Sequence, residues 1–336
     1  MGIHHVGHWQ DSPANAPLED LTMSFTSATL STSLHALDIG ETAQRLLASD
    51  QRGTVLAAVS NALYLLSEQG ELFWLATADV ARHPRGIRIS EPLPRLAVNT
   101  SFVVDGHGLI IGSDTVLDRS RASIWRAPRI SADDVLPVTC LPERLYVAFS
   151  ALDGLPSPAG LGSLLPEILH IATNEQACPR SQDLARVPAL ACPAIREIAH
   201  ACMVHDGEKI MAQTESLIGL GEGLTPSGDD FAGGLLFCFY WLSRLYPNHL
   251  PPLVRTNSIE RLSGRTNLIS FTVLKDLANG QGVEPLHLWL DCVLAGRPVA
   301  LIQQQAARLI RIGHSTGWDL LSGALTGLLL TLRLSA

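Results

Sequence analysis

The sequence predicts an α+β protein. A β-rich N-terminal domain, a small antiparallel sheet or barrel, precedes an all-helical C-terminal domain. From about residue 23 to residue 149, short apolar segments alternate with turn signals roughly every ten residues, as in antiparallel β structure. From about residue 161 onwards, apolar residues recur at helical spacing instead. Residues 153–160, between these regions, are dense in glycine and proline and indicate a boundary.

These patterns divide the chain into four segments. Residues 1–22 are polar and predict a flexible tail. Residues 23–150 form the predicted β-rich domain and residues 151–165 the linker. Residues 166–336 form the predicted helical domain, which contains a glycine-rich loop.

Turn residues mark where the strands of the β-rich domain are expected to end. Residues 55–66 and 72–76 flank the polar segment 68–71 and predict a hairpin. A short helix is expected over residues 42–48. Further strands are predicted over residues 86–89, 101–104, 109–111, 125–130 and 145–149.

In the C-terminal half, apolar residues stand three and four positions apart, which places them on one face of a helix. The run after residue 230 is apolar on nearly all sides and predicts a buried helix. Helices are predicted over residues 161–173, 194–205, 207–217, 228–246, 257–279, 285–295, 299–312 and 316–333.

Composition limits the class of protein. The 336 residues are enough for two domains and a substantial core. Hydrophobic residues make up 46% of the chain and charged residues 17%, which favours an apolar globular protein with a buried subunit interface, hence an oligomer. The net charge of −8, with no basic cluster, argues against nucleic acid as a partner.

Cysteine spacing and apolar runs indicate a cytoplasmic protein. The six cysteines include no CxxC pair and are interpreted as reduced thiols. No basic segment followed by an apolar one stands at the N-terminus, so no signal peptide is expected. Gly, Ser, Thr or Arg interrupts the longest apolar runs, which suit buried helices better than membrane spans.

The most informative stretch is residues 218–231, IGLGEGLTPSGDDF. Gly219, Gly221 and Gly223 alternate with other residues, and glycine lets a ligand approach backbone N–H groups closely. The first N–H groups of a helix attract an anion. The stretch therefore predicts an anion-binding loop that leads into a helix. It is neither a Walker loop, because no lysine follows, nor a dinucleotide fingerprint, because no clear strand–loop–helix unit frames it.

A second copy of this helix start lies near the C-terminal end. Residues 316–325 align with residues 227–236 as hydroxyl, Gly, any residue, Asp, apolar, two of any kind, Gly, any residue, Leu. Each copy reads as a capping box, with Asp230 or Asp319 at the third helical position. Each copy also has a glycine one turn after this aspartate, where a small residue lets another backbone approach. One interpretation is that these polar residues only start helices. The other is that two similar helix starts face one another across one site.

Asp229 has no counterpart in the second copy, where Trp318 stands. Asp229 is therefore the better candidate for acid–base chemistry, or for binding Mg²⁺ or another divalent cation. The identity of any cofactor stays open.

Other polar residues have a functional and a structural interpretation. Arg261 and Arg265 are expected on one face of the helix predicted over residues 257–279, and an arginine fork suits carboxylate or phosphate. His314 precedes the second helix start and is a candidate proton carrier. Turn, loop or solvated-face roles are the alternatives for these residues and for Asn61.

Three segments together resemble a bacterial family that includes the H subunit of allantoin-pathway oxamate carbamoyltransferase. They are residues 219–231, 265–270 and 313–319. The β region is also similar to that family, so the resemblance covers roughly residues 23–334. It implies a carbamoyl-transfer system of nitrogen metabolism, in which oxalurate and phosphate give oxamate and carbamoyl phosphate, and other carbamoyltransferase subunits as partners. Trp318 departs from the family pattern, in which a smaller residue is common.

The favoured function is an enzyme or enzyme subunit acting on a small anionic carbamoyl or carbonyl compound, with phosphate or an oxyanion at the Gly221–Gly228 loop. Catalysis is assigned to Asp229, Asp230 and His314. The predicted substrate-binding residues are Gly221, Gly223, Thr225, Ser227, Gly228, Arg265, Thr266, Ser270, Ser315, Thr316 and Asn61. The alternatives are a hydrolase or lyase of a carbamoyl-like compound, or a non-catalytic metabolite-binding subunit.

Overall fold

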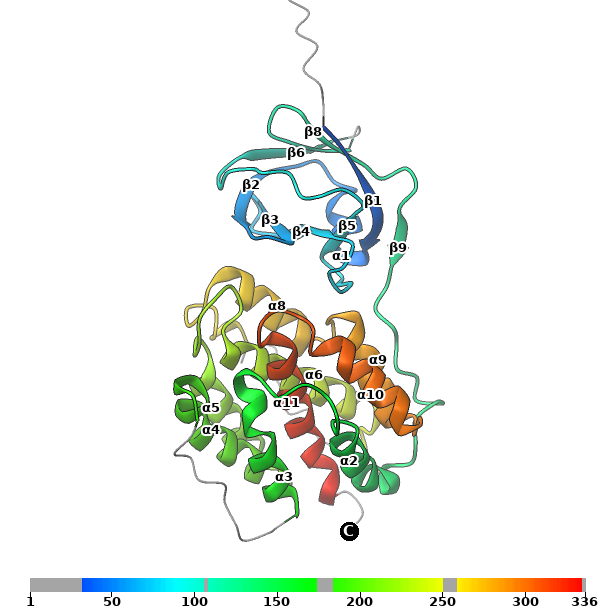
Figure 1. Ribbon diagram of the computed structural model, residues 1–336, viewed down its shortest axis with the longest axis vertical. Helices are drawn as coiled ribbons and strands as arrows, with labels where there is room; N and C mark the ends of the chain where they lie inside the picture. Colours follow the sequence, from blue (N-terminus) through cyan, green and yellow to red (C-terminus); the bar gives the residue numbers. More distant parts are fainter. Residues whose placement is uncertain (1–31, 106–107, 174–183, 250–258, 334–336) are drawn as a thin grey trace, which may run out of the picture.

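The computed structural model describes residues 32–105, 108–173, 184–249 and 259–333. Within them the chain forms a β-barrel followed by a helical region (Figure 1), which confirms the predicted α+β class. The predicted tail, residues 1–22, lies outside the described residues. None of the described helices is both long enough and apolar enough to cross a membrane.

Strand β1 closes the barrel. The strands are β1 (Thr32–Gly40), β2 (Gln51–Ala58), β3 (Ala62–Ser67), β4 (Leu72–Thr77), β5 (Gly86–Ile89), β6 (Ser101–Asp105), β7 (Gly108–Ile111), β8 (Thr115–Asp118) and β9 (Ser123–Trp125). They follow the order β5-β4-β3-β2-β6-β7-β8-β1, and β1 then pairs with β5 to complete the ring. Most neighbours are antiparallel, but β1 runs parallel to β8 and β9, and β4 runs parallel to β5. The expected antiparallel pairing is therefore corrected to a mixed one.

Alternating strand residues fill the barrel interior. Val55, Leu65 and Phe73 are completely buried there, and Phe73 packs edge-on against Phe102 with 5.5 Å between ring centroids. Helix α1 (Glu41–Leu46) adds apolar side chains to the same core. This core is separate from the larger one in the helical region.

Two segments predicted as strands are not strands. Residues 145–149 belong to helix α2 (Leu141–Ser150). Of the predicted strand 125–130, only Trp125 lies in a strand, as the last residue of β9, and residues 126–130 form neither helix nor strand. Leu141, Leu145 and Ala148 are buried at helical spacing. A five-residue apolar run does not by itself distinguish a strand from a helix.

The position of α2 bears on the domain boundary. Its buried residues belong to the helical core, and a short 3₁₀ helix, Val138–Cys140, leads directly into it. We propose that the boundary lies between Trp125 and Val138, earlier in the chain than the expected linker over residues 151–165.

The remaining helices fall close to their expected positions, with two exceptions: the helix expected from residue 194 begins at Arg186, and the helix expected over residues 257–279 begins later in the chain. They are α3 (Leu165–Thr173), α4 (Arg186–Met203), α5 (Gly207–Leu217), α6 (Ser227–Leu245), α8 (Leu268–Ala278), α9 (Glu284–Leu294), α10 (Val299–Leu309) and α11 (Thr316–Leu328). The helix expected over residues 257–279 begins only at Leu268. The side chain of Asn267 caps α8 there, accepting a hydrogen bond from the Ser270 N–H at 3.0 Å.

Helices α6 and α11 pack against one another through glycine. A Cβ atom added to Gly234 would overlap the carbonyl of Leu320, and one added to Gly323 would overlap the carbonyl of Phe231. The two glycines occupy equivalent places in the repeated sequence pattern, so the predicted close backbone approach is confirmed. The helices run in the same direction, because Gly327, one turn beyond Gly323, contacts Cys238 further along α6.

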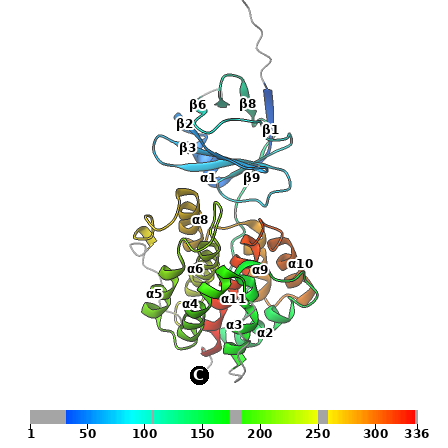
Figure 2. The ribbon, with the colours of Figure 1, turned by 60° about the vertical axis from the view of Figure 1, so that its left-hand side comes forward.

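Ion pairs join the barrel to the end of the helical region on which it sits (Figures 1 and 2). Arg85 donates to both oxygens of Asp276 in α8, at 2.6 and 2.9 Å. Arg82 donates to Asp38 in β1 and to Glu284 at the start of α9. The pair between Arg85 and Asp276 is mostly withdrawn from solvent, with 11% and 13% of the side chains exposed.

Replacing Arg85 with Ala should destabilise the protein by about 2 kcal/mol, because it leaves the carboxylate of Asp276 poorly solvated and without its partner. Burial raises the pKa of Asp276 and Arg85 opposes that shift, so the loss should grow between acid and neutral pH. Urea unfolding measures it. Lys209→Ala removes an exposed pair with Glu197 and should leave the urea midpoint unchanged. Equal losses in both variants would contradict the argument.

Candidate functional site

The loop between α5 and α6 is shaped by three glycines. Gly219, Gly221 and Gly223 have φ values of 83°, 124° and 95°, a region that favours glycine. A Cβ atom on Gly221 would lie 2.7 Å from the backbone nitrogen of Ser227, so the loop curls onto the start of α6.

The two repeated helix starts are built in the same way. The N–H of Gly228 donates to the Leu220 carbonyl at 2.8 Å, and the N–H of Gly317 donates to the Ile312 carbonyl at 3.0 Å. Both glycines lie against the end of the preceding helix, where a Cβ atom would overlap the carbonyls of Leu217 and Leu309 respectively.

The hydroxyl groups of the two helix starts meet. The Oγ1 atoms of Thr225 and Thr316 lie 3.3 Å apart, and the Oγ atoms of Ser227 and Ser315 lie 3.3 Å apart. The prediction that the two helix starts lie together is therefore confirmed. Two helices with parallel axes thus present their N-terminal ends, and the positive ends of their dipoles, at one place.

Asp230 and Asp319 lie beneath these hydroxyls, 4% and 0% exposed. Oδ1 of Asp319 accepts the N–H of Leu161 at 2.6 Å. The Oδ2 atoms of both aspartates are buried and have no hydrogen-bond partner among the described residues.

The surroundings of the two carboxyls raise their pKa values. Burial, together with the neighbouring charge of Asp319, holds the pKa of Asp230 well above its usual range, although Thr316 and Thr225 oppose the shift through hydrogen bonds. Burial raises the pKa of Asp319 to about 6, against hydrogen bonds from Leu161, Ser315 and Ser227. The two carboxyls therefore resist being ionised together.

The capping-box prediction was wrong for both helix starts. Neither start has a side-chain cap hydrogen bond: α6 begins after Pro226 and α11 after Ser315. Ser227 and Thr316 are the first helical residues, so each aspartate stands one position later than a capping box requires and faces the neighbouring helix.

Asp229 has a structural role, which differs from the helix-capping role predicted for Asp230. Its Oδ1 accepts the N–H of Gly219 at 2.6 Å, and its Oδ2 accepts the hydroxyl of Ser270 at 2.5 Å. With 2% of its surface exposed, Asp229 ties the glycine loop and the start of α8 together. We therefore assign it to holding the loop. Among the described residues, no three His, Cys, Asp or Glu side chains gather as a metal site would require.

The arginine segment does not form the predicted polar helix face. Residues 261–265 are a turn, so Arg261 and Arg265 do not share a helix surface. Arg265 is exposed and pairs with Glu215 at 2.8 Å. Ser270 bonds to Asp229, as described, while the hydroxyl of Thr266 is buried without a partner in the described chain.

His314 is an exposed residue in the turn before α11, and Asn61 is an exposed residue in the turn between β2 and β3. Tyr64 in β3 was not predicted as a site residue. The charge of Asp230 contributes to the raised pKa of Tyr64, after burial, which places this barrel residue near the helix starts. Strand alternation gave no signal that distinguished Tyr64 from a core residue.

Several backbone N–H groups around the helix starts donate to no acceptor within the described part of the chain. They belong to Gly221, Glu222, Gly223, Leu224, Thr225, Ser227, Thr316 and Trp318. Free N–H groups, helix dipoles and hydroxyls at one place are the usual elements of an oxyanion site.

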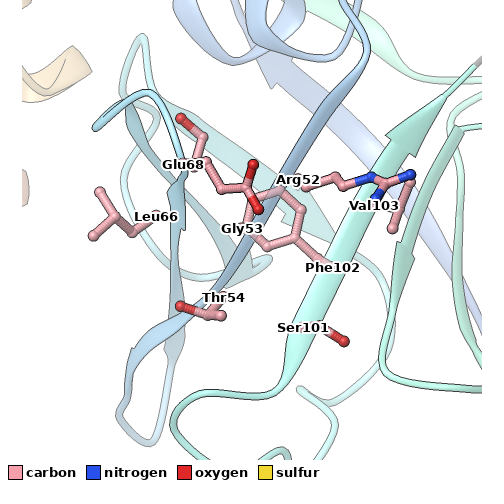
Figure 3. A pocket seen from close by; sticks show the side chains of 9 residues that line it. Arg52, Gly53, Thr54, Leu66, Glu68, Ser101, Phe102 and Val103 are labelled. Carbon is pink, nitrogen blue, oxygen red and sulfur yellow. The ribbon is translucent and has the colours of Figure 1, made fainter.

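A separate groove of about 440 Å³ lies on the barrel between β2, β3 and β6 (Figure 3). Gly53 is one of its lining residues, and Arg52 and Glu68 supply its charged side chains. The groove contains none of the predicted site residues. The five cysteines in the described residues, Cys140, Cys192, Cys202, Cys238 and Cys292, form no disulfide.

The fold and this arrangement define a class: an α+β protein whose candidate anion site lies where two parallel helix starts meet beside a β-barrel. Residues 217–328 match the family described as oxamate carbamoyltransferase subunit AllH. The matched segment runs from the end of α5 to the end of α11 and includes both helix starts, so the resemblance found in the sequence is confirmed over these residues. No solved structure matches the chain.

Proposed function

We propose that the protein is a subunit of a carbamoyltransferase of the oxamate type, and that it binds a small anionic carbamoyl compound, with phosphate or an oxyanion, at the starts of α6 and α11. One observation carries this proposal: the two starts lie side by side, with hydroxyls 3.3 Å apart and with free N–H groups on both helices. The family match supports the choice of reaction.

The chemistry of carbamoyl transfer suits such a site. Phosphate oxygen attacks the carbamoyl carbon of oxalurate, a C–O bond forms, and the C–N bond to the oxamate nitrogen breaks after that nitrogen gains a proton. Negative charge grows on the carbonyl oxygen during attack, and N–H groups fixed at helix starts stabilise it. We assign the N–H groups of Ser227 and Thr316 to this role.

Asp230 is the proposed proton donor to the leaving nitrogen. Its carboxyl is buried beneath the hydroxyls, and burial together with the charge of Asp319 raises its pKa, which favours the protonated form. When Asp230 is protonated, the hydroxyls of Thr225 and Thr316 no longer need to donate hydrogen bonds to a carboxylate there. They can then donate to a bound anion instead. Phosphate binding should therefore strengthen as pH falls.

Replacing Thr316 with Val should weaken phosphate binding about 10-fold, because one hydrogen bond to a charged ligand is lost while side-chain shape is kept. Isothermal titration calorimetry with inorganic phosphate measures the affinity. Thr272→Val is the matched control, since the exposed Thr272 bonds only to the Leu268 carbonyl of its own helix. Unchanged affinity in Thr316→Val would contradict the proposed anion site.

Turnover tests separate the remaining alternatives. Phosphate-dependent formation of carbamoyl phosphate supports a transferase, whereas phosphate-independent breakdown of the same compound indicates a hydrolase or lyase. The chain is assayed alone and with partner subunits, because a non-catalytic binding subunit would bind phosphate without turning anything over.

A further inference from the structure

A pocket of about 290 Å³ lies at the boundary between the barrel and the helical region. The barrel contributes Asn61, Asp79 and Arg88 to its lining, and the helical region contributes Glu284, Arg308 and Arg311. The volume is near the lower end of the range for small-molecule sites. The pocket is therefore large enough for a compound of a few heavy atoms.

The three arginines are not equivalent. Arg88 donates to Asp38 and to the Ala78 carbonyl, and Arg308 donates to Gln305 and Glu284. These two guanidinium groups are thus largely committed to the protein.

Arg311 has no hydrogen bond or ion pair to any residue that the structure describes, and the same holds for the side-chain amide of Asn61. Arg311 comes from the turn after α10 and Asn61 from the turn between β2 and β3. The pocket thus has one free guanidinium and one free amide on opposite sides of the domain boundary. An arginine fork matches the two oxygens of a carboxylate.

The acidic residues restrict the ligand further. Asp79 and Glu284 line the same pocket and would repel a doubly charged anion. Their oxygens can instead accept hydrogen bonds from N–H groups. A singly charged carboxylate with an amide at its other end satisfies both kinds of group.

Both sides of the pocket lead along the chain into the candidate anion site. Asn61 lies in the turn just before β3, the strand that contains Tyr64. The charge of Asp230 is one cause of the raised pKa of Tyr64, after burial. On the other side, Gly313 lines the pocket, and the start of α11 at Thr316 follows shortly after it. A ligand in the pocket would therefore lie next to the helix starts.

We propose that Arg311 and Asn61 bind the carboxylate of a small monocarboxylate that carries amide N–H groups, in a subsite distinct from the phosphate-binding helix starts. The proposal rests on the proposed function and names the part of the molecule that recognises the non-phosphate ligand. It transfers to Arg311 the role that the sequence suggested for Arg265, which is paired with Glu215 instead.

Calorimetry on the full chain tests the proposal with three probes: oxamate, its uncharged diamide oxamide, and inorganic phosphate. The parent protein should bind oxamate and not oxamide. Arg311→Ala and Asn61→Ala should each weaken oxamate binding about 10-fold while phosphate affinity stays within twofold of the parent. Arg261→Ala, which removes another exposed arginine outside the pocket, is the matched control and should bind oxamate like the parent.

Each other result counts against the subsite in a defined way. Oxamate binding that is unchanged in Arg311→Ala overturns it, as does equal binding of oxamide and oxamate. If the parent binds phosphate but not oxamate, the subsite fails while the proposed function stands. If Arg311→Ala weakens the binding of oxamate and of phosphate equally, the two ligands share one site, and the proposal of a distinct subsite is overturned. If the parent binds neither probe, both the subsite and the proposed function fail.

Discussion

Replacing Gly323 with Ala should lower the free energy of unfolding by about 3 kcal/mol or more, because the added methyl group has no room where α11 meets α6. Its Cβ atom would overlap the Phe231 carbonyl and would also lie 2.8 Å from the backbone nitrogen of Leu235. Both neighbours are backbone atoms inside a helix, so neither moves without shifting α6. The two helix starts would then separate, and phosphate binding should fall with stability.

This expected loss of stability is opposite in sign to the usual effect of replacing glycine with alanine in a helix. Alanine in a helix interior is normally about 1 kcal/mol more favourable than glycine. Gly264→Ala is the control, since a Cβ atom there meets nothing within 4 Å and the backbone has no positive φ. Urea unfolding of both variants decides the matter: a Gly323→Ala protein as stable as the parent would show that α6 and α11 are not in backbone contact.

The sequence predicted this contact because the packing repeats. Gly234 and Gly323 hold equivalent positions in two aligned segments, and a repeated small residue one turn after the shared aspartate indicates a close neighbour. The glycine loop was predicted for a similar local reason, since positive φ at alternating positions needs glycine. Local backbone requirements leave a direct mark on the sequence.

The roles of the carboxylates could not be predicted in the same way. Asp229 and Asp230 are neighbours, and consecutive residues on a helix point in directions about 100° apart. Which of them faces α11 depends on how α6 is rotated, and that is decided by packing over the whole helix. The sequence singled out Asp229 as the residue outside the repeat, whereas the structure buries Asp230 against Asp319 and ties Asp229 to the loop.

Ion pairs between segments far apart in the sequence could not be predicted either. Arg265 was predicted to be available because its partner Glu215 lies 50 positions earlier in the chain. Arg311 was not predicted as a site residue, because residues from both the barrel and the helical region line the pocket around it. The segment 145–149 was misassigned for a simpler reason, since five apolar residues fit a strand and a helix equally well.

Replacing Asp319 with Asn should make the protein more stable than the parent at pH 8, by about 2–3 kcal/mol, and this advantage should vanish near pH 4. Burial raises the pKa of the folded Asp319 to about 6, from an ordinary value of 3.8. Below about pH 4 the carboxyl is protonated in both states and its full contribution to stability is present. As pH rises towards 6 the unfolded chain loses this proton first, so the stability of the parent falls, while the Asn variant has no proton to lose.

The neighbouring Asp230 adds to the stability expected of Asp319→Asn at pH 8. The charge of Asp319 raises the pKa of Asp230, so removing that charge removes a repulsion between the two carboxyls. Asp229→Asn is the control and should behave oppositely. Both oxygens of Asp229 accept hydrogen bonds, from Gly219 and Ser270, and an amide nitrogen in place of one oxygen meets a donor. Urea unfolding of both variants and the parent between pH 4 and pH 8 measures the difference. If Asp319→Asn is less stable than the parent at pH 8, the folded protein holds Asp319 as a stabilised carboxylate, and the shared-burial account of the two helix starts is wrong.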